Sequence, residues 1–163
     1  MKTIFRILII ALIFSSCKKE QNKMSVALDN KVEISVKDKV GNDLLNPSKQ
    51  GALLNQNIKI YYLLDGIKKE INQANYDLPK NFMIYEIDGK YQMRLFLNCS
   101  SSVTTNTTYV QWNENDTDTF KTEILNNTKL ASITKLWYND SLVWNVYDFV
   151  YPDYKERSLE IIK

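Results

Sequence analysis

The sequence contains no histidine. This absence excludes the Ser-His-Asp and Cys-His catalytic triads, and it removes the imidazole ligand of nearly every common zinc or non-haem iron site. The four glycines form no Gly-x-Ser-x-Gly, Walker or Gly-x-Gly-x-x-Gly pattern, so neither a nucleophile elbow nor a phosphate-binding loop is indicated. We therefore expect a protein that is not an enzyme and that uses no cofactor and no metal.

Long hydrophobic runs are also scarce. The longest is Ile7 to Phe14, which follows Lys2 and Arg6. A membrane-spanning helix needs about 20 apolar residues, whereas the core of a signal peptide needs roughly 7 to 15, followed by small residues. Ser15 and Ser16 are such residues. The pattern predicts a signal peptide over residues 1–16, and an uncleaved amphipathic anchor is the alternative.

The chain has only two cysteines, Cys17 and Cys99. The segment Phe14-Ser15-Ser16-Cys17 resembles a bacterial lipobox, with Phe14 at the position where leucine is usual. This resemblance implies cleavage before Cys17 and lipid on that cysteine, and two or three acyl chains give durable membrane attachment. Once Cys17 is lipidated, the mature chain can form no internal disulfide. Cys99 is then expected to be a small buried apolar group rather than a reactive thiol.

No excess charge of one sign remains after cleavage. The first sixteen residues hold two of the 21 basic residues and none of the 19 acidic ones, so the mature chain has a formal net charge of zero. This balance gives no basic stripe for nucleic acid, and it predicts that membrane contact comes from the lipid alone. Residues 17–30 are polar and aperiodic, which predicts the lipidated cysteine and a flexible tether before one domain at residues 31–163.

The rest of the chain alternates between apolar and polar residues in short runs separated by turn residues. The clearest example is Ile84 to Met93, in which Asp88-Gly89 favours a type I′ turn between two strands. Asn139-Asp140 predicts a second tight hairpin, and no ten-residue stretch has a helical stripe. The other expected strands are Val32–Val36, Ile58–Leu64, Tyr109–Asn113, Thr119–Leu125, Ile133–Tyr138 and Leu142–Val146. We predict an all-β fold, a single antiparallel β-sandwich of about seven to nine strands.

Two groups of carboxylates could carry chemistry. Glu86 and Glu123 could form the acid pair of a glycoside hydrolase, but both occupy polar strand positions, where a solvated face is the simpler interpretation. The turn Glu114 to Asp118 crowds three carboxylates together, as calcium sites do. It lacks the glycine and distal glutamate of an EF-hand, and such turns usually hydrogen-bond their own backbone.

Aromatic residues are abundant near the C-terminus. Trp137, Tyr138, Tyr151 and Tyr154 are candidate contacts for a sugar or a protein partner if they are exposed. The alternative is that these rings fill the core, as aromatic strand residues usually do. Alternation places Trp144 on one face with Leu142 and Val146, so we predict that Trp144 is buried.

Several segments resemble those of small uncharacterised lipoproteins of Bacteroidetes. The resemblance is carried by residues 36–47, 112–119 and 133–138, and it implies an immunoglobulin-like or transthyretin-like sandwich without a catalytic motif. Cys17-Lys18-Lys19-Glu20 is similar to the signal that places such lipoproteins on the outer face of the outer membrane. Asp140-Ser141-Leu142 resembles the O-glycosylation motif of these bacteria, which implies modification of Ser141.

These observations predict an exported lipoprotein of the outer membrane that faces the periplasm or the cell surface. Its domain is expected to be a non-enzymatic binding or structural module. We expect a protein or glycan partner, and we expect the lipid to hold the protein to the membrane. A carbohydrate-binding module that uses the C-terminal aromatics and a carboxylate-dependent glycosidase are the alternatives.

Overall fold

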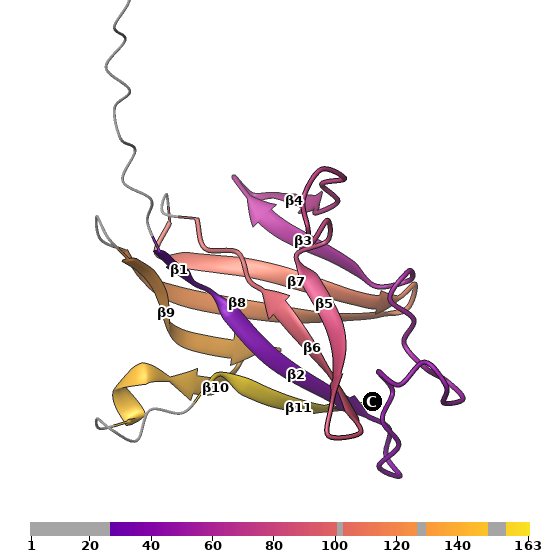
Figure 1. The fold of residues 1–163 in the computed structure, drawn as a ribbon. Coiled ribbons are helices and arrows are strands. Elements are labelled where there is room, and N and C mark those ends of the chain that lie inside the picture. The colour runs from indigo at the N-terminus through magenta and orange to yellow at the C-terminus, as the bar shows by residue number, and fades with distance from the viewer. Residues whose placement is uncertain (1–26, 101–102, 127–129, 150–155) are drawn as a thin grey trace, which may run out of the picture.

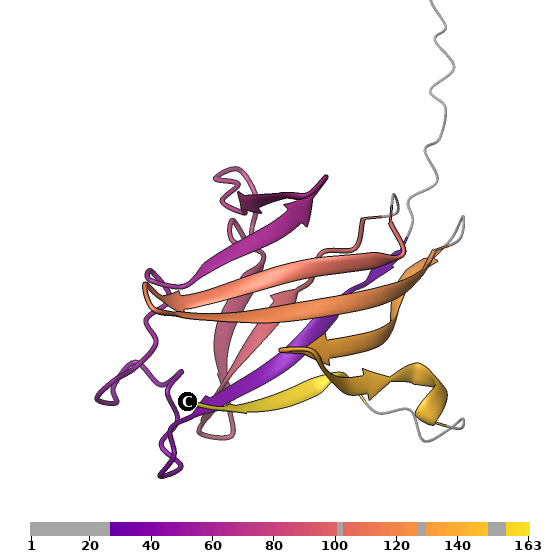
Figure 2. The same cartoon turned by 180° about the vertical axis from the view of Figure 1, so that it is seen from behind.

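The computed structural model describes residues 27–100, 103–126, 130–149 and 156–163. Eleven strands and one turn of 3-10 helix (η1, Val146–Asp148) make up its regular structure, and none of the described residues lies in an α-helix. The strands form two sheets that enclose one core (Figures 1 and 2). The predicted all-β sandwich is therefore confirmed. Within the described ranges, no helix is long and apolar enough to cross a membrane.

The larger sheet has the strand order β1-β9-β8-β7-β3-β4, and β10 also pairs with β9. Its strands are β1 (Ala27–Asp29), β3 (Lys59–Leu64), β4 (Ile67–Glu70), β7 (Thr105–Asn113), β8 (Asp116–Asn126), β9 (Leu130–Tyr138) and β10 (Ser141–Asn145). Strands β1 and β10 contact successive parts of the same side of β9, because β1 pairs with residues 130–132 and β10 with residues 135–138.

The smaller sheet has the order β11-β2-β6-β5. Its strands are β2 (Lys31–Lys37), β5 (Phe82–Ile87), β6 (Lys90–Phe96) and β11 (Ser158–Ile162). Strand β2 follows β1 directly in the chain but belongs to the other sheet, so the chain crosses between the layers at Asn30. The Asn30 side chain donates to the Leu97 carbonyl at 2.6 Å. The first described strand thus begins at Ala27, four residues before the expected start of the domain at residue 31.

Both sheets are mixed, which differs from the expected antiparallel arrangement. Strand β1 runs parallel to β9, and β11 runs parallel to β2. Parallel neighbours need long connections, and these pairs join segments from opposite ends of the chain. Hairpin turn signals carry no information about such pairs. The expected strands correspond to β2, β3 and β5 to β10, whereas β1, β4 and β11 were not expected.

The two predicted tight turns are confirmed by their backbone angles. Asp88 and Gly89 have φ values of 51° and 74°, and Asn139 and Asp140 have values of 44° and 68°. Positive φ at both central positions defines the type I′ turn, which matches the twist of the strands that it joins. Asp65-Gly66 has the same geometry and closes the β3–β4 hairpin, with Leu64 opposite Ile67.

The core is built from the inward-facing residues of both sheets. On β2 and β6 the expected alternation holds, since Val32, Ile34 and Met93 are fully buried. The larger sheet contributes Trp112 and Phe120, which are also fully buried. The remaining members of the core are Val36, Leu44, Leu45, Ile58, Ile60, Ile71, Phe82, Leu95, Leu97, Val110, Ile133, Leu136, Trp144 and Ile161.

Trp144 is buried as predicted, but Leu142 does not share its face. Leu142 pairs with Trp137 on the outside of the larger sheet, whereas Trp144 pairs with the buried Leu136. The register of β10 shifts between these two residues. Such a β-bulge inserts one extra residue, and it therefore reverses the side to which the following side chains point.

Candidate functional site

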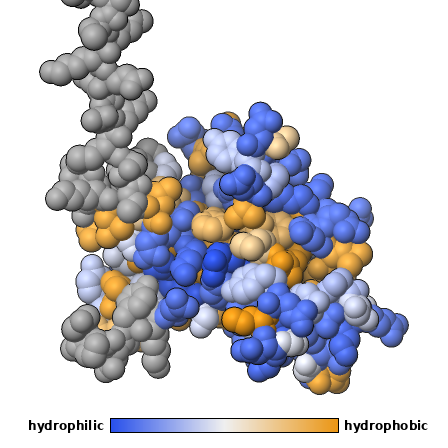
Figure 3. All heavy atoms as spheres, in the orientation of Figure 1, coloured by the Kyte–Doolittle hydropathy of each residue, from blue (hydrophilic) through white to orange (hydrophobic). Residues whose placement is uncertain are grey.

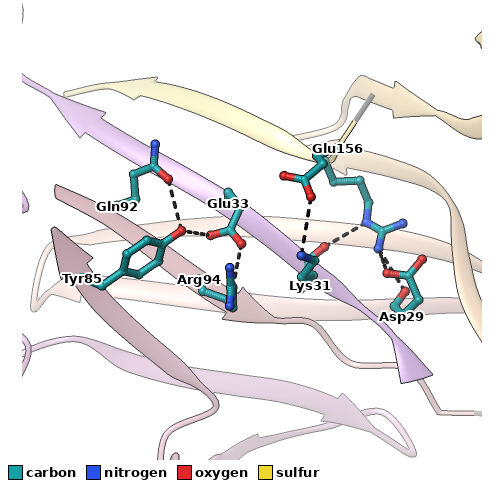
Figure 4. Close-up of polar contacts among 8 residues, drawn as sticks. Asp29, Lys31, Glu33, Tyr85, Gln92, Arg94 and Glu156 are labelled. Carbon is teal, nitrogen blue, oxygen red and sulfur yellow. Dashed lines mark hydrogen bonds and ion pairs between the residues drawn. The ribbon is translucent and has the colours of Figure 1, made fainter. Parts of the chain in front are cut away.

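The outer face of the smaller sheet carries a connected group of polar side chains (Figure 4). Glu33 on β2 lies opposite Arg94 on β6, and Tyr85 on β5 lies opposite Gln92 on β6. These residues occupy the outward positions of their strands, because their neighbours Ile34, Met93 and Leu95 point into the core. We call these four residues the Glu33 network.

The carboxylate of Glu33 is the centre of this network and is only 8% exposed. Arg94 Nε donates to its Oε1 at 2.6 Å, and the Tyr85 hydroxyl lies 2.9 Å from its Oε2 and 3.2 Å from Gln92 Oε1. Burial and the hydrogen bond to Glu33 raise the pKa of Tyr85, so the phenol keeps its proton at neutral pH. The buried negative charge is therefore neutralised by Arg94 and solvated by Tyr85.

A second buried charge, Arg157, lies beside β2 and is 4% exposed. Its guanidinium donates from Nε to the Lys31 carbonyl at 2.9 Å and from Nη2 to the Asp29 carbonyl at 3.2 Å, and it forms an ion pair with the Asp29 carboxylate. The guanidinium carbon also lies 5.0 Å from the centre of the Trp144 ring. Arg157 thus joins β1, β2 and β10 at the point where the N-terminal segment enters the fold.

A cavity of about 310 Å³ separates these two groups and is lined by Asp29, Lys31, Glu33, Glu156 and Arg157. Its size is at the lower end of the range for ligand pockets. Each lining carboxylate has a cationic partner, since Asp29 pairs with Arg157, Glu33 with Arg94, and Glu156 with Lys31 at 3.8 Å. Each carboxylate therefore already has an ion-pair partner. The lining can hydrogen-bond a polar group.

The two glutamates considered as an acid pair do not meet. Glu86 is exposed on β5 of the smaller sheet, whereas Glu123 lies on β8 of the larger sheet and pairs with Lys135 at 2.9 Å. Glycoside hydrolysis needs both carboxyl groups on either side of one bond. The structure therefore does not bring these residues into one site.

In the carboxylate-rich turn, a lysine lies between two of the carboxylates. Lys163 Nζ lies 2.8 Å from Asp116 Oδ1 and 2.6 Å from Asp118 Oδ2. Asp118 also accepts from Trp112 Nε1 at 2.7 Å and from Asn139 Nδ2 at 2.8 Å. Among the residues that the structure describes, no group of three or more histidine, cysteine, aspartate or glutamate side chains could hold a metal ion.

The candidate aromatic residues divide between the two faces of the larger sheet. Trp137 is half-buried on the outer face, and Lys135 Nζ lies 5.9 Å from its ring centre. Tyr138 points inward and packs on Phe120, with the two ring centres 5.4 Å apart. Tyr151 and Tyr154 lie outside the described residues. The two described candidates therefore cannot form one binding surface.

Two other tyrosines share the outer face with Trp137. Tyr61 on β3 lies directly opposite Tyr109 on β7, and Lys68 Nζ lies 4.4 Å and 4.7 Å from the two ring centres. Alternation along β7 could have identified Tyr109, because it lies between the buried Thr108 and Val110. Ser141, the expected glycosylation site, is exposed at the start of β10.

No family model, curated protein or solved structure matches this chain.

Replacement of Arg94 by methionine should leave the Glu33 carboxylate buried without its cation. We expect this variant to lose about 2–3 kcal/mol of unfolding free energy, less than a fully buried pair because Arg94 is partly exposed. Urea denaturation at pH 7 measures the loss. The control is Lys37→Met, which breaks the exposed Lys37–Glu160 pair and should cost less than about 1 kcal/mol. Equal losses in the two variants would contradict the role of Arg94.

Asp118 should make stability depend on pH in the acid range. Burial raises the pKa of Asp118, but hydrogen bonds from Lys163, Asn139 and Trp112 outweigh it and hold the pKa below its usual value of 3.8. A lowered pKa stabilises the fold above the pKa of the unfolded chain, and this contribution is lost as pH falls through the folded value. Asp118→Asn should therefore destabilise by about 1–3 kcal/mol at pH 7 and by progressively less below pH 4.

Urea denaturation between pH 7 and pH 3 tests this expectation. In a Lys163→Met background the pH-dependent part of the effect should shrink, because the cation that lowers the pKa of Asp118 is gone. An effect of Asp118→Asn that is the same at every pH would argue against this linkage.

Proposed function

We propose that this chain is an exported lipoprotein, anchored to the outer membrane through Cys17, whose β-sandwich is a non-enzymatic binding or structural module of the cell envelope. The observation that carries the proposal is the order of features along the chain. A segment with the pattern of a signal peptide ends at Cys17, a short polar stretch follows, and a sandwich with paired charges begins at Ala27.

The way in which the chain enters the fold supports the anchoring role. Strand β1 is only three residues long, yet Arg157 binds both its last carbonyl and the carboxylate of Asp29. A buried guanidinium with three acceptors holds its partners far more firmly than an exposed ion pair does. Any pull transmitted through residues 17–26 would therefore act on a strand that is fixed to the rest of the domain.

The paired charges support a binding or structural role over a catalytic one. The carboxylates around the cavity each contact a cation, which is Arg157, Arg94 or Lys31. Their charges are thus engaged in contacts within the fold. The rim of this cavity and the neighbouring Glu33 network form the polar surface that we assign to partner binding.

The anchoring is tested by the intact mass of the membrane-extracted protein beside a Cys17→Ser form. We expect a mass that begins at residue 17 and carries acyl chains, because the thiol and the freed amine of that cysteine are the acylated groups. The Cys17→Ser form should lack the acyl mass and should leave the membrane fraction. An uncleaved or unacylated mass for the parent protein would refute the proposed anchoring.

Glycan binding on the outer face of the larger sheet is a second candidate. It is favoured by the half-buried Trp137, Tyr61 and Tyr109, which share this face. Aromatic rings on a flat sheet face can stack on the apolar face of a sugar. Lys68 and Lys135 lie over these rings and would have to move aside.

A glycan array distinguishes this second candidate. If the face binds sugars, the parent protein should bind at least one glycan, and Trp137→Ala should weaken that binding by at least about tenfold, the equivalent of 1.4 kcal/mol. The control is Tyr147→Ala, because Tyr147 is 73% exposed and lies in η1, not on the strands that carry Trp137, Tyr61 and Tyr109. An array without hits, or equal losses in both variants, would eliminate glycan binding on this face.

A further inference from the structure

Four exposed apolar residues lie at one end of the larger sheet, around both of its faces. They are Leu28, Val103, Leu125 and Leu130, with exposed fractions of 63%, 48%, 53% and 37%. We call them the entry-end patch, since Leu28 lies in β1, the strand through which the N-terminal segment enters the fold. Figure 3 shows apolar surface where β1 meets the ends of β8 and β9.

The strand register brings these four residues to the same end. Leu125 pairs with Ser132 and shares the outer face of the sheet with Leu130, whereas Leu28 pairs with the buried Ala131 and emerges on the other face at the same end. The backbone N–H of Ile124 donates to the carbonyl of Thr104 at 3.4 Å, which places Val103 beside this end of β8. The patch therefore joins three strands with the segment that precedes β7.

We propose that the entry-end patch rests on the surface of the phospholipid bilayer in which the Cys17 lipid is anchored. The patch would bury its side chains at the boundary between headgroups and acyl chains, as apolar residues of peripheral proteins do. This inference depends on the proposed lipid anchor, and it adds the orientation of the domain on the membrane.

The length of the connection supports this occupant. Residues 18–26 lie between Cys17 and Ala27, the first residue of β1. The ten residue steps from Cys17 to Ala27 span at most about 35 Å when extended. The patch therefore cannot move far from the bilayer. Tethering raises the local concentration of one binding surface at another to about the millimolar range, so a small patch that binds lipid weakly on its own is sufficient.

The charges at this end are compatible with contact with an anionic membrane. Asp29 pairs with Arg157, and Glu123 pairs with Lys135 at 2.9 Å. These described carboxylates are neutralised by their partners and add little repulsion toward acidic headgroups. Because Arg157 fixes β1 to the rest of the domain, Leu28 keeps its position relative to Leu125 and Leu130.

The opposite end of the sandwich provides a matched control. Val40 follows β2 at the end away from β1, and it is 83% exposed. Figures 1 and 2 show this loop and the β5–β6 turn far from the entry of the N-terminal segment. If the entry-end patch faces the bilayer, Val40 points away from it.

The test places one tryptophan reporter at each end of the membrane-extracted, mature protein. Leu125→Trp, Leu28→Trp and Val40→Trp forms are reconstituted in phosphatidylethanolamine–phosphatidylglycerol vesicles with brominated acyl chains, which quench nearby indole rings. Emission of the parent protein, which has three native tryptophans, is subtracted. Far-UV circular dichroism checks that each exposed substitution leaves the fold intact, and the intact mass of each preparation reports its acylation.

We expect the Leu125→Trp and Leu28→Trp signals to be quenched and shifted to shorter wavelength, and the Val40→Trp signal to be unchanged. In an acylated preparation, equal quenching at both ends or no quenching at either would overturn the orientation and leave the anchor intact. A preparation without acyl chains would overturn the anchor itself, and with it this inference. The two failures are thus distinguished by the mass.

Discussion

The structure depends on the guanidinium of Arg157, a buried cation that reaches three acceptors. It is 4% exposed, and it binds the carbonyls of Lys31 and Asp29 and the carboxylate of Asp29. The chain crosses from one sheet to the other between these two residues. Without Arg157, two carbonyls at this crossing would lose their donor, and an unsatisfied buried polar group costs about 1–3 kcal/mol.

Other buried charges in the described sandwich are likewise paired with an opposite charge. Glu33 is held by Arg94, and Asp118 is held by Lys163, so the most buried carboxylates each face one cation. Burial of a charge is costly unless it is paired and hydrogen-bonded, and these contacts meet that requirement with neighbouring tyrosine, tryptophan and asparagine donors. Within the described sandwich, basic and acidic residues are thus partly arranged in specific local pairs. These pairs also tie strands together, because Glu33 and Arg94 lie on neighbouring strands of the smaller sheet.

Sequence patterns predicted the parts of the fold that depend on local signals. Alternation identified β2 and β6, and Asp88-Gly89 and Asn139-Asp140 identified two hairpins because positive φ restricts the residues allowed there. Strand β4 was not predicted, because Ile-Lys-Lys-Glu has no apolar alternation. Strand β1 was not predicted, because three residues are too few to show a pattern. The bulge in β10 also gives no signal in the sequence, so alternation wrongly predicts that Leu142 and Trp144 share one face.

Far less of the candidate site could be predicted from the sequence. Arg157 binds groups that precede it by 126 and 128 residues, and no local pattern links an arginine to partners at such a separation. The prediction of the aromatic candidates rests on their closeness in the chain. Adjacent strand residues point to opposite faces, so Trp137 and Tyr138 were separated by the geometry of β9 itself.

The parallel pairing of β11 with β2 also has a consequence for the order of events during biosynthesis. Residues 158–162 form an edge strand whose partner β2 begins at residue 31, so β11 adds to this sheet only after the long stretch of chain between the two strands has been made. Loop closure over such a distance slows folding. We therefore expect the edge strand β11 to join the fold late, after the antiparallel hairpins have formed.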